Sequence, residues 1–161
     1  MGHMINGFIA NAENLSRAAR HKSNCHLCFL EQGFAFLPVF ADMVDPQERV
    51  SSMQEFYGLT DSLSQWAMAE STQYSIVYIE TDYFGGTGAQ AAISWRDGQI
   101  SFGPLMTGDG PRAKRSTLLD GAVNQCLRHL GVLRGDASDE FDAMGLGRHR
   151  SNESFIAANR A

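Results

Sequence analysis

Three apolar runs between residues 74 and 105, separated by short links that contain glycine, constrain the fold of this chain most strongly. The runs read YSIVYIE, QAAISW and QISFGPL, and their β-branched and aromatic residues are typical of strands. The first link contains Gly85, Gly86 and Gly88, and the second is RDG, residues 96–98. Links this short join neighbouring antiparallel strands, because a parallel connection needs a crossover of about a dozen residues. The sequence therefore predicts consecutive antiparallel strands in this region.

The remaining segments predict one more hairpin and several helices. The stretch HLCFLEQGFAFLPVF, residues 26–40, places Gly33 between two apolar runs, and Pro38 indicates that the second strand ends there or lies at an edge. Apolar spacing, proline and capping residues predict helices over residues 5–20, from 45 to about 56, over 61–70 behind an N-cap at Thr60, from a cap at Ser116 or Thr117 to Gly131, and after Ser151.

Strands outnumber the helices that could connect parallel strands, so the predicted class is α+β. We expect a mostly antiparallel sheet of about five strands with helices packed on one face. The length of 161 residues corresponds to a single domain, large enough to fold without disulfides or metals. We take this domain to span residues 4–161 and interpret residues 1–3, Met-Gly-His, as a cloning remnant.

Composition and charge argue against several classes of function. The net charge of −5 argues against nucleic-acid binding, since phosphate contacts require a basic surface. No apolar run approaches the roughly 20 residues that span a bilayer, and the N-terminus lacks the zones of a signal peptide, so we expect no membrane partner. Three cysteines cannot all pair with one another, which is typical of a protein in the reducing cytoplasm.

Two carboxylates at the end of the first predicted strand form the first candidate site. Glu80 and Asp82 are two residues apart, so their side chains project from the same face if the strand continues. Enzymes place general bases and metal ligands at such strand ends. The alternative is structural: Gly85, Gly86 and Gly88 allow a tight or bulged connection, and the two acids are solvated. Most such groups serve no chemistry, so we adopt the structural interpretation.

A second candidate site combines Cys25-x-x-Cys28 with Cys126-x-x-His129, which together supply four ligands that zinc accepts. The segment CHLCFL enters a predicted strand, however, and would direct Cys25 and Cys28 to opposite faces of the sheet. Cys126 falls on the apolar stripe of a predicted helix, where a cysteine behaves as a small hydrophobic residue. We therefore predict no bound zinc, no other cofactor and unreactive thiols.

The third candidate site is the charged tail, residues 139–150, where acidic side chains precede the run GRHR. These groups could form a surface network of charges. Alternatively, Arg148 and His149 could reach over the sheet to Glu80 and Asp82, which would give an acid–base pair beside an anion-binding arginine. The sequence contains no GxSxG motif for a nucleophilic serine.

The combination of YIETDYFGG-G-Q, FGP, the helix around AVNQCLRHLGV and the tail DEFDAMGLGRHRS resembles a group of small uncharacterised bacterial proteins of the immunity type. The resemblance extends from Tyr78 to about Glu153 and leaves out the N-terminal part with Cys25 and Cys28. It implies a stand-alone protein that neutralises a toxin from rival cells by contact, and it transfers no catalytic residue.

We therefore expect a non-enzymatic binding protein that occludes another protein, and the resemblance implies that this partner is a toxin. The expected contact residues are Asp82, Tyr83 and Phe84, joined by the tail residues Arg148, His149 and Arg150. The alternatives are a small hydrolase or transferase that uses Glu80 and Asp82 with Arg148 and His149, and an adaptor stabilised by zinc.

Overall fold

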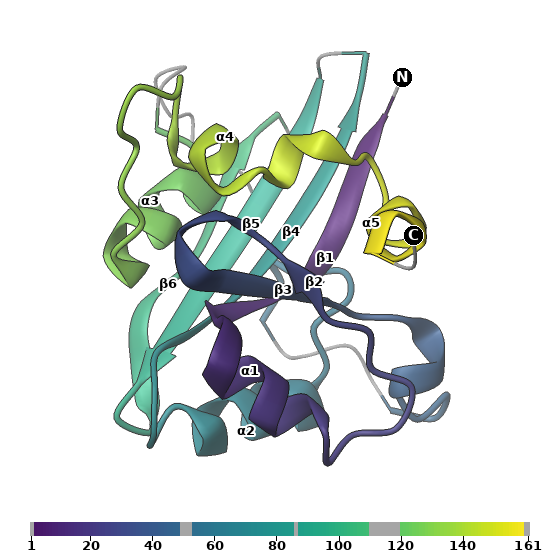
Figure 1. Cartoon of the computed structure of the whole chain (residues 1–161). Helices are drawn as coiled ribbons and strands as arrows, with labels where there is room; N and C mark the ends of the chain where they lie inside the picture. The colour runs from purple at the N-terminus through teal and green to yellow at the C-terminus, as the bar shows by residue number, and fades with distance from the viewer. Residues whose placement is uncertain (1, 49–52, 86, 110–119, 160–161) are drawn as a thin grey trace.

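The computed structural model describes residues 2–48, 53–85, 87–109 and 120–159 (Figure 1). Six strands form one antiparallel sheet in the order β2-β3-β1-β4-β5-β6. The strands are β1 (His3–Asn11), β2 (Cys28–Phe29), β3 (Phe34–Pro38), β4 (Ile76–Phe84), β5 (Thr87–Arg96) and β6 (Gln99–Gly108). The α-helices are α1 (Ala12–Ala19), α2 (Asp61–Glu70), α3 (Ala122–Leu130), α4 (Glu140–Met144) and α5 (Asn152–Asn159).

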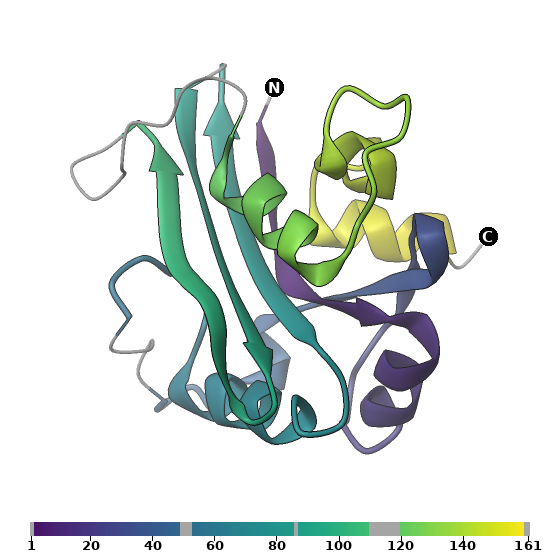
Figure 2. The same cartoon turned by 90° about the vertical axis from the view of Figure 1, so that its left-hand side faces the viewer.

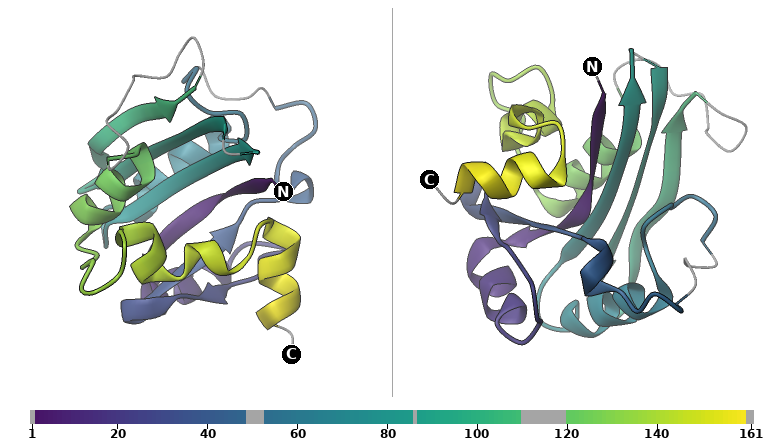
Figure 3. Two further views of the ribbon diagram at one scale, coloured as in Figure 1. Left: turned by 90° about the horizontal axis from the view of Figure 1, so that it is seen from above. Right: turned by 90° about the vertical axis from the view of Figure 1, so that its right-hand side faces the viewer.

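The predicted class, α+β with a mostly antiparallel sheet, is confirmed, with six strands in place of about five. Helices cover both faces of the sheet and not one, because both faces are apolar. On one face, Ile79 packs in a core with α3, α4 and α5, and on the other, Tyr78 packs in a core with α1 and α2. We call these the α3 face and the α2 face; Figure 2 shows α3 lying along the first, and Figure 3 shows both sides.

The prediction of one helix over residues 5–20 is wrong, because its first half is β1. This strand lies between β3 and β4 and is buried on both faces, with Ile9 in the α3-face core and Phe8 in the α2-face core. Burial on both faces removes the two-residue alternation that marks a strand. Gly7 shows how closely the strands approach, since a Cβ there would lie 2.3 Å from the carbonyl oxygen of Leu37.

Two predicted helix starts are confirmed by their caps. The Thr60 hydroxyl accepts the N–H of Leu63 at 3.2 Å at the start of α2, and the Ser151 hydroxyl accepts the N–H of Ser154 at 3.1 Å in α5. The helix predicted from residue 45 is wrong, because the described residues there form turns. Among the described residues, no helix is long and apolar enough to cross a bilayer.

The predicted helix before Gly131 is shorter than expected. It begins at Ala122 behind Gly121, while Ser116 and Thr117, the predicted caps, lie outside the described residues. It ends at Gly131, as predicted. The turns also follow the sequence, because β3 ends at Pro38 and residues 96–98 join β5 to β6.

The C-terminal segment completes the sheet beside β1 where β3 diverges from it. The N–H of Met4 donates to the carbonyl of Arg150 at 2.8 Å. The side chain of Asn152 accepts the N–H of Asn6 at 3.1 Å and donates to the carbonyls of Asn6 and Val39 at 3.0 and 2.9 Å. One buried amide thereby satisfies backbone groups of both strands where they separate.

Candidate functional site

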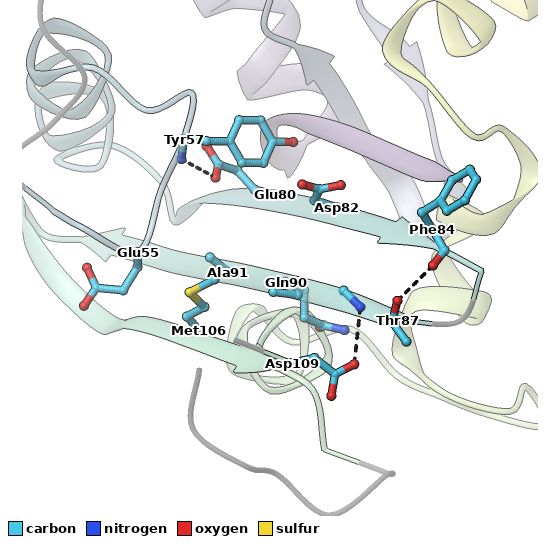
Figure 4. Close-up of a pocket in the computed structure, with 12 residues that line it drawn as sticks. Glu55, Tyr57, Glu80, Asp82, Phe84, Thr87, Gln90, Ala91, Met106 and Asp109 are labelled. Carbon is cyan, nitrogen blue, oxygen red and sulfur yellow. Dashed lines mark hydrogen bonds between the residues drawn. The ribbon is translucent and has the colours of Figure 1, made fainter. Parts of the chain in front are cut away.

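The α2 face is only partly covered, and its uncovered end forms an open groove of about 470 Å³. Strands β4, β5 and β6 supply the floor, and the segment before α2 supplies one wall (Figure 4). We call this the sheet groove; it is lined by Glu55, Tyr57, Glu80, Asp82, Phe84, residues 87–91, Met106 and Asp109.

Small side chains on the central strand of this floor make the groove. In the register of the sheet, Ala91 lies between Glu80 on β4 and Met106 on β6, and Ala89 lies opposite Asp82. Side chains directly opposite one another share a face of the sheet. The two alanines therefore leave a depression between larger neighbours, and its floor is apolar.

Glu80 anchors the wall of the groove and is not the solvated acid that the sequence predicts. Its side chain is buried, and one carboxylate oxygen accepts the N–H of Tyr57 at 2.8 Å. The other oxygen accepts the N–H of Gly58 at 2.7 Å and the hydroxyl of Tyr78 at 2.9 Å. Burial raises the pKa of Glu80, and these hydrogen bonds oppose that rise. The carboxylate thus joins the segment before α2 to β4.

Tyr57 forms the wall itself. Its hydroxyl donates to the carbonyls of Thr81 and Ile5 at 3.2 and 3.3 Å, so the side chain lies across β1 and β4. Burial and the neighbouring charges of Glu80 and Asp82 raise the pKa of this tyrosine. It remains a neutral hydrogen-bond donor with an exposed ring surface facing the groove.

Asp82 and Phe84 lie on the same face as Glu80, as the two-residue spacing predicts. Both are exposed, Phe84 at 75% of its surface. Met4, which lies opposite Asp82 on β1, is exposed at 53%. The groove therefore opens between an acid and two exposed apolar side chains.

Residues 82–84, which the sequence predicts as contact residues, are the last three residues of β4 and not a loop. Tyr83 projects to the α3 face, where its hydroxyl accepts the side-chain amide of Gln90 at 2.9 Å. Gln90 in turn accepts the N–H of Val123 at the start of α3, at 2.7 Å. Strand alternation thus places Tyr83 and Phe84 on opposite faces of the sheet, and Gln90 links Tyr83 to the start of α3.

Of the two described glycines from the end of β4 to the first residues of β5, Gly85 and Gly88, the close approach of the strands requires Gly88. A Cβ at Gly88 would lie 2.0 Å from the carbonyl oxygen of Asp82, and its φ is +149°. Gly85 also has a positive φ, +62°, but nothing lies within 4 Å of its Cβ position. Gly86 lies outside the described residues.

Gly88→Ala is expected to lower the free energy of unfolding by about 2 kcal/mol, because both strain and overlap must be relieved. Gly85→Ala, the matched control, should cost about 1 kcal/mol or less, since only backbone conformation opposes it. Urea unfolding of the two variants and the wild type measures both. Equal losses would show that the overlap at Gly88 relaxes freely.

The structure does not bring the tail residues to Glu80 and Asp82. Arg148 forms an ion pair with Glu31, and the ring of His149 packs edge-on against Phe155, with centroids 4.9 Å apart. Phe155 belongs to the core of the α3 face, whereas both acids point to the α2 face. An acid–base pair of His149 with either carboxylate is therefore not assembled.

The other tail groups stabilise their own segment. The side chain of Arg150 is exposed, and its backbone carbonyl accepts the N–H of Met4 in β1. The carboxylate of Asp139 caps α4 by accepting the N–H of Asp142 at 2.8 Å. Glu140 is 3.0 Å from Arg128, which lowers the pKa of this carboxyl. The charges thus form local pairs and caps, as in the surface-network interpretation.

The residues of the candidate zinc site are divided between the two faces of the sheet. Cys28 and Cys126 are buried in the α3-face core, Cys25 borders the α2-face core, and the ring of His129 packs on Phe102. Burial raises the pKa of Cys28 to about 11 and also raises that of Cys126. In the described ranges, no three metal-ligating side chains gather at one point. That the protein binds no zinc stays a prediction.

Sequence reasoning missed the segment that forms the groove wall. The role of Tyr57 and Gly58 depends on an acceptor more than twenty positions along the chain, so no local pattern marks them. One usable feature is a glycine just before the N-cap of a helix. A Cβ at Gly58 would lie 3.3 Å from a carboxylate oxygen of Glu80 and 2.8 Å from the amide nitrogen of Asn6.

Comparison with protein-family models, with curated proteins and with solved structures finds no match to this chain.

Proposed function

We propose that this chain is a non-enzymatic inhibitory protein of the immunity type, which neutralises a toxin by contact through the sheet groove. The observation that carries the proposal is the pair of exposed apolar side chains at the mouth of the groove. Phe84 and Met4 are 75% and 53% exposed, on strands whose other phenylalanine, isoleucine and valine side chains are buried. Exposed apolar groups beside a hollow are typical of protein-binding surfaces.

The register of the sheet places these two side chains near one another. Met4 lies opposite Asp82, and Phe84 is two residues further along β4 on the same face. Such diagonal neighbours are within reach of long and aromatic side chains. Together with the apolar floor at Ala89 and Ala91, they provide a continuous surface that a partner can cover.

The carboxylate best placed for catalysis serves the fold instead. Glu80 accepts three hydrogen bonds, from two backbone N–H groups and a tyrosine hydroxyl, so most of its acceptor capacity serves the fold. A general base must reach the proton that it removes, and a partner residue usually orients it. Neither His149 nor Arg148 is near enough to do so. This arrangement supports binding over hydrolysis or group transfer.

The proposal places the protein in the cytoplasm of the cell that makes it. The three cysteines are free thiols, which suits a reducing compartment. An inhibitor there needs a stable surface that is ready before the toxin arrives. The sheet provides one, because strands held by hydrogen bonds on both sides lose little conformational freedom on binding.

Phe84→Ala is expected to weaken toxin binding by about 2 kcal/mol, or roughly 30-fold, because it removes a large rigid apolar contact. Candidate toxins are those encoded by the genes that flank the gene for this chain. Each is expressed in a susceptible host with and without this protein, and the neutralised one is used for affinity measurements. Phe29→Ala is the matched control, since Phe29 is 65% exposed but lies on the edge strand β2, which β3 and β1 separate from β4.

The proposal fails if none of these toxins is neutralised by the wild-type chain. It also fails in its choice of surface if Phe84→Ala and Phe29→Ala bind the toxin equally well. Circular dichroism of both variants establishes that any loss of binding is not a loss of fold.

A further inference from the structure

We infer that the sheet groove receives an arginine side chain, presented by a basic segment of the partner protein between apolar neighbours. This inference deepens the proposed function and rests on it, because it specifies the chemistry of the partner at the same surface.

Charge complementarity favours a basic partner. Three acids border the groove, Glu55, Asp82 and Asp109, and the carboxylate of Glu80 lies beneath them. Of the described lining residues, none is lysine or arginine. The chain as a whole carries a net charge of −5, so its field attracts positive segments over longer distances as well.

Unlike Glu80, which accepts three hydrogen bonds within the protein, the acids at the rim retain acceptor capacity. Each ion pair found among the described residues lies outside the groove, at Glu13, Asp120, Glu140 and Glu31. Asp109 accepts the N–H of Gly88 at a long 3.4 Å, through one of its two oxygens. Asp82 is exposed on the face of the groove. Carboxylates in this state can accept hydrogen bonds from an incoming cation.

The walls and floor distinguish arginine from lysine. Tyr57 and Phe84 offer aromatic surfaces at the two ends of the groove, and Ala89, Ala91 and Met106 make the floor apolar (Figure 4). A guanidinium group is planar, weakly hydrated and stacks on aromatic rings, whereas an ammonium group is compact and strongly hydrated. Arginine therefore leaves water for such a groove at a smaller cost than lysine does.

The dimensions of the groove leave room for more than the arginine. A hollow of about 470 Å³ lies within the range that holds a drug-sized molecule, so it also accepts part of a neighbouring residue. An apolar neighbour would contact the exposed faces of Met4 and Phe84. The expected segment therefore alternates basic and apolar side chains.

The test uses capped tripeptides as probes, Leu-Arg-Leu, Leu-Lys-Leu and Leu-Gln-Leu, titrated into the wild-type protein and followed by amide NMR shifts. We expect Leu-Arg-Leu to shift the amides of residues 87–91 and to bind about tenfold more tightly than Leu-Gln-Leu, with Leu-Lys-Leu between them. Added salt should weaken the arginine peptide most, because screening acts on the charged contact.

The variant Asp82→Asn with Asp109→Asn is expected to weaken binding of Leu-Arg-Leu about tenfold while leaving Leu-Gln-Leu unchanged. The matched control is Asp42→Asn with Glu153→Gln. These two acids line a separate pocket of about 560 Å³, and their neutralisation alters the net charge by the same amount. If overall charge alone attracts the peptide, both double variants will weaken binding equally, and the inference is overturned.

The remaining outcomes separate this inference from the proposed function. Equal binding of Leu-Gln-Leu and Leu-Arg-Leu would mean that the groove recognises only apolar groups, and would overturn the inference. A wild-type dimer in sedimentation experiments that Phe84→Ala abolishes would mean that a second copy of the chain occupies the groove, and would overturn it as well. A toxin neutralised without any arginine-specific binding in the groove overturns the inference and leaves the proposed function standing. Arginine-specific binding without neutralisation of any toxin supports the groove chemistry and rejects the proposed function.

Discussion

Glu80→Ala is expected to lower the free energy of unfolding by about 3 kcal/mol, because three donors around this buried carboxylate lose their acceptor at once. These donors are the N–H groups of Tyr57 and Gly58 and the hydroxyl of Tyr78. Each buried group left without a partner costs about 1–3 kcal/mol, and partial hydration of the freed segment lowers the total. The variant should also lose order at residues 56–59, which amide hydrogen exchange would report as faster exchange.

Two variants serve as controls for this prediction. Asp82→Ala removes an exposed carboxylate from the same face of the same strand and should change stability by about 0.5 kcal/mol or less. Glu80→Gln keeps the shape of the side chain but turns an amide NH₂ toward one of the three donors, so the free energy of unfolding should fall by about 1–2 kcal/mol. If Glu80→Ala is as stable as Asp82→Ala, the carboxylate is not the anchor of the groove wall.

The loss of stability in Glu80→Ala is expected to depend on pH. Burial raises the pKa of Glu80 above its ordinary value of 4.5, so the native state binds this proton more tightly than the unfolded state does. The contribution of this linkage is fully present below pH 4.5 and is lost as the pH rises through the raised pKa. The stability difference between wild type and Glu80→Ala should therefore be larger at about pH 4 than at about pH 7, as measured by urea unfolding. Glu140 titrates alike in both proteins, so its opposite effect cancels in the difference.

Asn152→Ala is expected to lower the free energy of unfolding by about 3 kcal/mol and to release α5 from the sheet. The side-chain amide of Asn152 forms hydrogen bonds with the N–H and carbonyl of Asn6 and with the carbonyl of Val39. Asn152 is only 6% exposed. Alanine cannot replace any of these three hydrogen bonds, and the site is too enclosed for bulk water to do so fully. Thermal unfolding and the amide exchange rate of Asn6 measure the loss.

The control for this change lies in the same helix. Asn159 also donates its amide to a backbone carbonyl, that of Phe155 at 2.9 Å, but its side chain is exposed. Asn159→Ala should cost no more than about 0.5 kcal/mol. Asn152→Asp keeps the acceptor for the N–H of Asn6 and loses both amide hydrogens, so its stability should lie between those of the wild type and Asn152→Ala. If Asn152→Ala proves no less stable than Asn159→Ala, then the strand break at β1 and β3 is held by other contacts.

The expected order of effects at the groove differs from the one that the sequence suggests. From sequence, a glycine of the link at 85 or 86 should be more sensitive to change than Glu80, since the acid is taken as solvated. The structure makes Glu80 a buried acceptor and leaves the Cβ position of Gly85 open. Of the described glycines in this link, Gly88 is the sensitive one, because a Cβ there would meet the backbone of Asp82.

The sequence predicted correctly those features whose cause is local. The hairpin turn at residues 96–98, the N-caps Thr60 and Ser151, and the end of β3 at Pro38 each depend on residues within a few positions. Two-residue spacing likewise placed Glu80 and Asp82 on one face. Turn conformations, caps and strand alternation follow from the chemistry of neighbouring residues, so a single sequence contains them.

Tertiary structure alone decided where the groove lies and what its residues do. The sequence could not show that β1 is a central strand, because burial on both faces of a strand erases the pattern that identifies one. It could not show that Glu80 binds the segment before α2, or that Tyr83 holds α3 while Phe84 faces solvent. Each of these depends on which distant segment packs against the residue, and that choice follows from the burial of the whole apolar surface. Local propensities, which involve a few residues at a time, do not determine it.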